Sequence, residues 1–271
     1  MAIVPTIESS ALSVIGPVRE DNQDSIFASH QPQSGETGFL YAVADGMGGY
    51  SHGGVASALA LQELSNEVFK TISIDQKTLR RGVENANLSV YKTAQKLGAG
   101  RMGTTLTAAC IMGDQVHIAH VGDSRAYLIR DHRANCLTAD HTTVGDMVRA
   151  KLISADKIRT HAQRSILTKA VGLGLFIQPD ITKLKLQEGD RIILCSDGLW
   201  SLIQDDEFAS LSRGVSPQKT TQNLVDLALH RETDDNASVV VFDIIKFTHI
   251  SSAVGQGEKN ILKSIIRKWA R

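Results

Sequence analysis

The chain has 271 residues, of which 42% are hydrophobic and 21% charged, and its formal net charge at pH 7 is zero. This composition is typical of an ordinary globular protein, large enough for one domain or two small ones. A neutral chain gives no global support for binding nucleic acid. The charge is uneven, because residues 247–271 hold five Lys or Arg and one Glu, a net charge of +4, which leaves −4 for the rest.

Three cysteines, Cys110, Cys136 and Cys195, are scattered without a C-x-x-C spacing. An odd number without a framework predicts reduced thiols and a cytoplasmic protein. The N-terminus lacks a basic stretch followed by a long apolar run, and no run of about 18 apolar residues occurs. We therefore expect neither a signal peptide nor a transmembrane helix.

In chain order, the hydrophobic pattern alternates between the period of a strand and that of a helix. After a ragged start over residues 1–8, it predicts strands at residues 11–16, 25–28, 39–44, 104–111, 115–121, 126–130, 183–186, 193–196 and 237–245. It predicts amphipathic helices at residues 56–72, 79–97 and 216–231. Residues 131–135 are expected to form a polar turn, and residues 138–178 mix short helical pieces with polar stretches. Runs of strands separated by helices favour antiparallel sheets covered by helices over a parallel doubly wound sheet.

Four aspartates lie where a predicted strand ends or begins. Asp45 and Asp197 each follow a buried strand and precede a glycine, Asp123 follows residues 116–122, and Asp235 precedes the last strand. A lone aspartate in such a place is usually a turn former. If the four converged at one edge of a sheet, they would repel one another unless cations lay between them. Hard oxygen ligands of this kind suit Mg²⁺, Mn²⁺ or Ca²⁺ and not Zn²⁺.

Three of these aspartates could hold a pair of divalent ions. Ions bound by Asp45, Asp197 and Asp235 could share a bridging water, lower its pKa and make hydroxide available near neutral pH. The Gly46 carbonyl could serve as a backbone ligand, because no side chain obstructs it. The planar guanidinium of Arg19 could grip two oxygens of a phosphate. The polar run of residues 19–24 suits a ligand site and a solvated hairpin loop equally well.

Other catalytic motifs fit poorly. Residues 122–126 approach a G-x-S-x-G nucleophile elbow but lack the last glycine and lead into a strand instead of a helix. The glycines at 46, 48 and 49 do not complete G-x-G-x-x-G, and the histidines show no zinc-binding spacing. These observations count against a serine hydrolase, a dinucleotide-binding protein and a zinc enzyme.

Seven short motifs follow one another along the chain. They are Arg19-x-x-Asn22-Gln23-Asp24, Val43-Ala44-Asp45-Gly46-Met47-Gly48-Gly49, Gly103-Thr104-Thr105, Val121-Gly122-Asp123-Ser124-Arg125, Leu137-Thr138-x-Asp140-His141-Thr142, Cys195-Ser196-Asp197-Gly198-Leu199 and Asp235-Asn236-x-Ser238. In order and spacing, over roughly residues 8–246, the chain resembles the metal-dependent Ser/Thr protein phosphatases of type 2C, especially the compact bacterial forms.

This resemblance implies an α+β fold over residues 1–246, a four-layer αββα sandwich of two antiparallel β-sheets flanked by helix pairs. It implies Mn²⁺ or Mg²⁺ as cofactor, with two ions bound tightly and a third more weakly. The implied metal ligands are Asp24, Asp45, Gly46, Asp123, Asp197 and Asp235. Asp24 would often act through water, and Asp123 would help Asp197 to hold the third ion. Arg19 would bind phosphate, and residues 142–178 would form a flap beside the site.

The activity implied is hydrolysis of phosphoserine and phosphothreonine in proteins by a hydroxide that bridges two metals, reversing a Ser/Thr kinase. Partners would be phosphorylated protein substrates and a cognate kinase system. Met47 departs from animal members, which have a histidine there that is thought to act as general acid. The leaving-group proton would then come from a metal-bound water or from His52.

Two further departures concern Gly54, where many bacterial members have Glu, and Gln23, where animal members have Glu. Neither is a core ligand, so we expect an active enzyme. Three alternatives remain: an inactive relative that binds phosphoproteins, a phosphatase that serves a sigma-factor switch, and a protein whose acids sequester calcium.

Residues 247–271 are predicted to form a basic amphipathic tail. On one helical face lie Ile261, Leu262, Ile265, Ile266 and Trp269, with basic residues elsewhere. The pattern fits a helix that contacts a membrane surface or a partner protein, and equally a helix packed on the domain itself.

Overall fold

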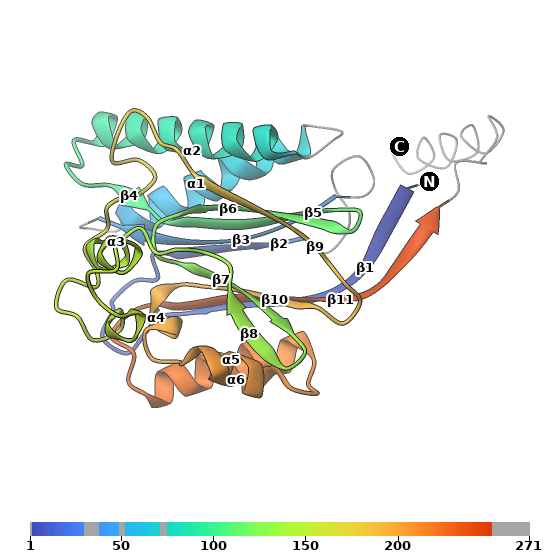
Figure 1. Ribbon diagram of the computed structural model, residues 1–271. Helices are drawn as coiled ribbons and strands as arrows, with labels where there is room; N and C mark the ends of the chain where they lie inside the picture. The colour runs from blue at the N-terminus through green and yellow to red at the C-terminus, as the bar shows by residue number, and fades with distance from the viewer. Residues whose placement is uncertain (1, 30–37, 49–51, 71–74, 251–271) are drawn as a thin grey trace.

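The computed structural model describes residues 2–29, 38–48, 52–70 and 75–250 as a sandwich of two antiparallel sheets (Figure 1). Within these residues, one sheet has the strand order β1 (Ala2–Val14), β11 (Ala237–Ile250), β10 (Arg191–Cys195), β7 (Arg125–Arg130) and β8 (Arg133–Cys136). The other has the order β2 (Asp24–Ala28), β3 (Gly38–Met47), β5 (Leu106–Met112), β6 (Gln115–Val121) and β9 (Asp180–Lys185), with β4 (Gly103–Thr104) pairing to β3.

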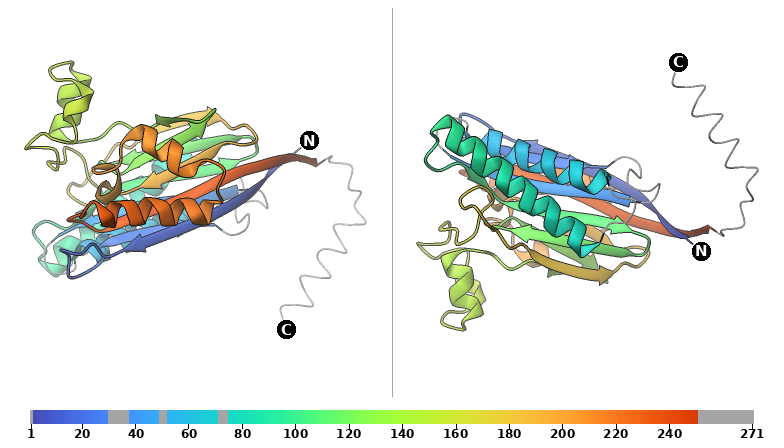
Figure 2. Two further views of the ribbon diagram at one scale, coloured as in Figure 1. Left: turned by 90° about the horizontal axis from the view of Figure 1, so that it is seen from below. Right: turned by 90° about the horizontal axis from the view of Figure 1, so that it is seen from above.

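Helices cover both outer faces of the sandwich. The helices α1 (His52–Phe69) and α2 (Gln76–Leu97) lie over the sheet that contains β3. The helices α4 (Asp197–Trp200), α5 (Asp205–Ser212) and α6 (Pro217–His230) lie over the other sheet. The predicted four-layer αββα sandwich is therefore confirmed. In a separate segment, α3 (Thr143–Arg149) and a 3₁₀ turn (Ala155–Lys157) project from one end (Figure 2).

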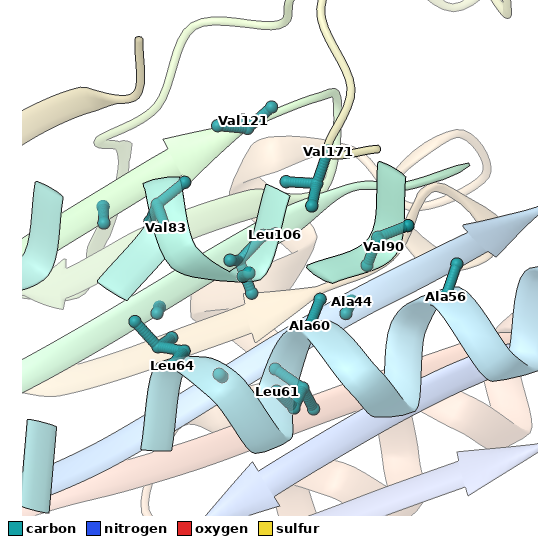
Figure 3. Packing of buried hydrophobic residues seen from close by; sticks show 14 of the residues in the cluster. Ala44, Ala56, Ala60, Leu61, Leu64, Val83, Val90, Leu106, Val121 and Val171 are labelled. Carbon is teal, nitrogen blue, oxygen red and sulfur yellow. The ribbon is translucent and has the colours of Figure 1, made fainter. Parts of the chain in front are cut away.

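The sequence of the inner strand β3 is apolar without alternation because both of its faces are covered. Leu40, Ala42 and Ala44 pack beneath α1 and α2, where the small residues Ala56 and Ala60 allow close approach (Figure 3). The intervening side chains face the opposite sheet, and Tyr41 stacks on Phe242 with ring centroids 4.2 Å apart. A strand buried on both faces needs apolar residues at every position.

The predicted helix limits agree with capping interactions. Asp75 accepts a hydrogen bond from the Thr78 amide at 2.8 Å and begins α2, which ends at Gly98 with a φ of 63°. Ser216 caps α6, and Pro217 occupies its first turn. A side-chain acceptor before the helix and a left-handed glycine after it satisfy backbone groups that the helix cannot.

The prediction was wrong at both ends of the domain. The expected ragged start is strand, since β1 pairs with β11 from Ala2↔Ile250 to Val14↔Ala237. β11 also continues beyond the predicted end at residue 245, so the predicted domain boundary after residue 246 falls inside it. These two segments are strands because they pair with each other across a long separation in the sequence. The predicted tail helix lies outside the described residues, and no helix within them is long and apolar enough to cross a membrane.

Two short elements were missed. The predicted polar turn at residues 131–135 is a tight hairpin into β8, with Asp131 and His132 at φ of 52° and 62°. The usual signal for such a turn is Asn-Gly or Asp-Gly, whereas this turn has Asp131-His132. α5 begins with a capping box between Gln204 and Glu207, a Q-x-x-E pattern that could have revealed it.

Candidate active site

A cavity of about 630 Å³ opens at the end of the sandwich where β3 and β10 finish. Its lining includes the predicted site residues Arg19, Asp45, Gly46, Asp123, Asp197 and Asp235. The structure thus brings together all four aspartates that the sequence placed at strand ends. Asp24, the remaining predicted ligand, does not belong to the lining.

The position of Asp45 is fixed through its backbone by two threonines. The Thr105 hydroxyl accepts a hydrogen bond from the Asp45 amide at 2.8 Å, and the Thr105 amide donates to the Asp45 carbonyl at 2.8 Å. The Thr104 hydroxyl donates to the same carbonyl at 2.9 Å. Because both backbone groups of Asp45 are bound, the motif Gly103-Thr104-Thr105 holds the carboxylate in place from the neighbouring β4 segment.

Asp197 and Asp235 meet across the junction of β10 and α4. Asp197 is the first residue of α4, and Gly198 lets this helix approach the chain that follows Asp235. A Cβ atom on Gly198 would lie only 2.1 Å from the Asn236 carbonyl oxygen, so no larger residue fits without a shift. The Oδ1 atom of Asp197 is buried without a hydrogen-bond partner among the described residues. A buried carboxylate oxygen left in this way needs a cation or a proton.

Asp123 reaches the cavity from the turn between β6 and β7. Gly122 precedes it with a φ of 106°, a conformation that side chains rarely adopt. The carbonyl of Asp123 accepts a hydrogen bond from the Trp200 indole at 2.8 Å. The turn therefore brings a buried carboxylate beside Asp197 and ties it to α4.

Asp24 lies behind the cavity. In the register of β2 and β3, Asp24 is opposite Asp45, and its carboxylate accepts a hydrogen bond from the Ser196 hydroxyl at 2.9 Å. The role of Asp24 as a metal ligand through water therefore stays a prediction.

Burial and mutual repulsion dominate the electrostatics. Desolvation, followed by the charges of Asp24 and Asp197, raises the pKa of Asp45 well above its usual range. Desolvation likewise raises the pKa of Asp24 to about 7, and desolvation with the charge of Asp235 raises the pKa of Asp197 to about 6. Among the described residues, neither Asp45 nor Asp197 has an Arg or Lys within salt-bridge distance. The protein alone therefore leaves these charges uncompensated.

The donor set fits a hard divalent cation. The lining offers carboxylate and backbone oxygens, and it includes neither His nor Cys among the described residues. In the part of the chain described, no three acidic, His or Cys side chains form a complete cage by themselves. Ions here would bind Asp45, Asp197 and Asp235, with other positions filled by the Gly46 carbonyl and by water. Mg²⁺ and Mn²⁺ suit such partly hydrated oxygen sites.

Arg19 lies at the mouth of the cavity and contacts one of the acids. Its guanidinium donates to Asp235 Oδ2 at 2.6 Å and to the Asp234 carbonyl at 3.1 Å. The loop that carries it is held by Asn236, which accepts from the Gln23 amide at 2.9 Å and donates to the Asp21 carbonyl at 3.0 Å. Sequence reasoning gave Asn236 no role; its place directly after Asp235 was the available signal.

The segment predicted to be a flap contributes Ser165 and Leu167 to the cavity lining. Arg159 anchors it by donating to the Trp200 carbonyl at 2.9 Å and the Ile203 carbonyl at 3.2 Å. His52, the suggested proton donor, does not line the cavity. Met47 does, at the position where a histidine was noted as absent.

Comparison with known proteins agrees with this architecture. The family model described as protein phosphatase 2C matches residues 19–231. A Streptococcus pyogenes protein of the protein phosphatase 2C type is 33% identical over 232 residues, covering 84% of this chain and 93% of that protein. A crystal structure of the Mycobacterium tuberculosis serine/threonine phosphatase PstP is 32% identical with a TM-score of 0.81, covering 89% of this chain and 99% of that one.

A structure of the PstP catalytic domain in complex with two manganese ions is 30% identical, with a TM-score of 0.79, and covers 90% of this chain and 100% of that one. Fold, motif order and cavity thus lead to the same assignment. The chain belongs to the protein phosphatase 2C family.

Proposed function

We propose that this protein is a metal-dependent protein serine/threonine phosphatase that uses two Mn²⁺ or Mg²⁺ ions. The observation that carries the proposal is the convergence of four aspartates, Asp123 buried and the others partly buried, on one cavity, without basic partners for Asp45 and Asp197. Relatives named as serine/threonine phosphatases and the two-manganese structure of PstP support it. Asp123 would help to hold a third, more weakly bound ion.

Each residue of the site has a definite task in this reaction. When bound, the two ions supply a water of lowered pKa as nucleophile. Asp45, Asp197 and Asp235 hold the ions, and the threonine contacts of Asp45 prevent it from moving during the reaction. Arg19 binds and orients the phosphate by exchanging its contact with Asp235 for two phosphate oxygens. The half-exposed position of Arg19 permits this exchange, since 51% of its side chain is accessible.

The biological setting remains part of the proposal. Phosphorylated proteins would be the substrates, and the enzyme would reverse a cognate Ser/Thr kinase in the cytoplasm. The relatives PstP and PhpP, named as protein phosphatases, support this class of substrate. The match to this chain covers 45% of the length of PstP.

Hydrolysis of a phosphothreonine peptide and a phosphotyrosine peptide, with Mn²⁺ and with excess EDTA, tests the proposal. We expect Mn²⁺-dependent release that is faster from phosphothreonine and is abolished by EDTA. An Asp45→Asn variant serves as the control for a contaminating phosphatase. Mn²⁺ binding without turnover on either peptide would contradict the proposal and favour an inactive phosphoprotein-binding protein.

A further inference from the structure

A buried histidine outside the cavity forms two hydrogen bonds with Gly122, the residue before Asp123. His141 is 1% exposed and holds both backbone groups of Gly122. The Gly122 amide donates to His141 Nδ1 at 3.0 Å, and the His141 amide donates to the Gly122 carbonyl at 2.8 Å. On the other side, Trp200 holds the Asp123 carbonyl. The peptide groups on both sides of Asp123 are therefore bound, the one before it by the His141 backbone amide. The imidazole adds a contact one peptide further back, at the Gly122 amide.

This contact requires one tautomer of the imidazole. A backbone amide can donate only to an unprotonated Nδ1, so the ring proton must be on Nε2. The Nε2 atom lies 3.1 Å from Asp180 Oδ2, so this carboxylate is within reach as the acceptor of that proton. Burial lowers the pKa of His141, although Asp180 opposes the shift. The ring is thus neutral, as its acceptor role demands.

A lysine beside the ring favours the opposite tautomer. Lys169 Nζ lies 3.3 Å from His141 Nε2 and 3.1 Å from Asp180 Oδ1. The ammonium group can donate to Nε2 only if that atom carries no proton, and then Nδ1–H would face the Gly122 N–H. Two donors would oppose each other and the anchor would be lost. Asp180 prevents this by binding both the Nε2 proton and the lysine.

We propose that His141, kept in the Nε2–H tautomer by Asp180, is a positioning residue for Asp123 and for the weaker cation that Asp123 helps to hold. The inference rests on the proposed function, because it gives the site a supporting layer of contacts. It also connects the site to the flap, since Lys169 and Thr168 approach from that segment and the Thr168 amide donates to the His141 carbonyl at 2.8 Å. Supporting residues of this kind commonly affect metal affinity by about 10-fold to 100-fold.

Two substitutions at His141 distinguish the role of its hydrogen-bond acceptor from the role of its side-chain volume. His141→Asn places an amide oxygen near the position of Nδ1 and retains the acceptor, whereas His141→Gln moves the amide beyond it. We expect His141→Gln to weaken the weakest class of Mn²⁺ site about tenfold, measured by calorimetry on metal-stripped protein. We expect the kcat at subsaturating Mn²⁺ to fall while KM for the peptide changes little, and His141→Asn to recover most of both losses.

Asp180 and Lys169 provide a sharper test, because both are partly exposed and their removal leaves the core intact. Asp180→Ala should shift the ring toward the Nδ1–H tautomer, which ¹⁵N NMR of the labelled imidazole detects directly. Adding Lys169→Met to Asp180→Ala removes the competing donor, so the double variant should return to Nε2–H and to stronger Mn²⁺ binding than the single variant.

A matched control is His117→Gln in β6, since His117 is also a buried histidine and its Nδ1 has no partner among the described residues. It should leave the Mn²⁺ titration unchanged. Three results would overturn this inference without touching the proposed function. The first is an Nδ1–H imidazole at His141 in the wild-type protein, and the second is Mn²⁺ binding as weak in His141→Asn as in His141→Gln. The third is Mn²⁺ binding in the double variant that is no stronger than in Asp180→Ala. Wild-type protein that neither binds Mn²⁺ nor hydrolyses phosphothreonine would instead overturn the proposed function.

Discussion

The acidic residues at the two ends of strand β10 differ in whether an arginine neutralises them. At its beginning, a second cavity of about 540 Å³ is lined by Asp190 and Asp243, and each acid has an arginine partner. Arg130 binds Asp190 through two hydrogen bonds of 2.6 and 2.7 Å. Arg191 binds Asp243 in the same two-pronged way at 2.6 and 2.7 Å. Both acids are compensated within the protein.

At the other end of β10, the larger cavity contains acids that are not compensated in this way. Asp45 and Asp197 face each other and other carboxylates, and burial with repulsion raises their pKa values. Since both ends have a cavity of similar volume, size alone does not identify the functional site. The pairing of charges identifies the functional site instead. Acids paired with arginine stabilise the fold, whereas acids without a basic partner indicate that a cation binds from solution.

The largest effect is expected from Asp45→Asn. Loss of a carboxylate that would hold the catalytic ions should lower kcat at least about 1,000-fold, or about 4 kcal/mol of transition-state stabilisation. The same change should raise the thermal midpoint of metal-free protein near pH 8, because it removes a buried charge beside like charges. Peptide hydrolysis and calorimetry in EDTA measure the two effects. Near-normal turnover would contradict the two-ion site.

The reverse outcome is expected at the other end for Asp190→Ala. This change leaves Arg130 and the Gln187 amide, which donates to Asp190 at 2.7 Å, without their acceptor. We expect a loss of about 3 kcal/mol in the free energy of unfolding, measured in urea, with kcat unchanged. A large loss of activity without loss of stability would remove the distinction between the two ends.

Removing one threonine hydroxyl near each end of β10 allows a matched comparison. Thr105→Val removes the acceptor of the Asp45 amide and should lower kcat about tenfold, or about 1.4 kcal/mol. Thr220→Val removes a buried hydroxyl that accepts from Arg191 at 2.7 Å, and it should reduce stability alone. Equal losses of kcat in both variants would show that general loosening, and not the place of Asp45, controls the rate.

The smallest effect concerns another paired acid, Glu207. Hydrogen bonds from Arg231 and from the Gln204 amide lower the pKa of Glu207 to about 2. Because this pKa is below the usual value near 4.5, the stabilisation is complete above that pH and is lost as the pH falls toward 2. Glu207→Gln should therefore cost about 1 kcal/mol at pH 7 and progressively less below pH 4.5. A cost independent of pH would contradict the ionic origin.

Sequence patterns predicted well what depends on local chemistry. The apolar run of β3 followed by Asp45 and Gly46 indicated a strand that delivers a ligand, and Ser216 with Pro217 marked the start of α6. The pairing of residues 2–10 with β11 could not be predicted, because these residues form a strand through hydrogen bonds to a distant segment. A local hydrophobic pattern does not show that partner. The role of Asn236 was missed for the same reason: its two hydrogen bonds join segments that are more than 200 residues apart.

The cation requirement is tested most directly by differential scanning calorimetry of metal-stripped wild-type and Asp45→Asn protein over a series of Mn²⁺ concentrations. Each site filled at 100 times its dissociation constant should stabilise the folded protein by about 2.7 kcal/mol. The account predicts a rising thermal midpoint for the wild type, reversed by EDTA, and a much smaller rise for the variant. A wild-type midpoint that does not respond to Mn²⁺, or an equal rise in both proteins, would contradict it.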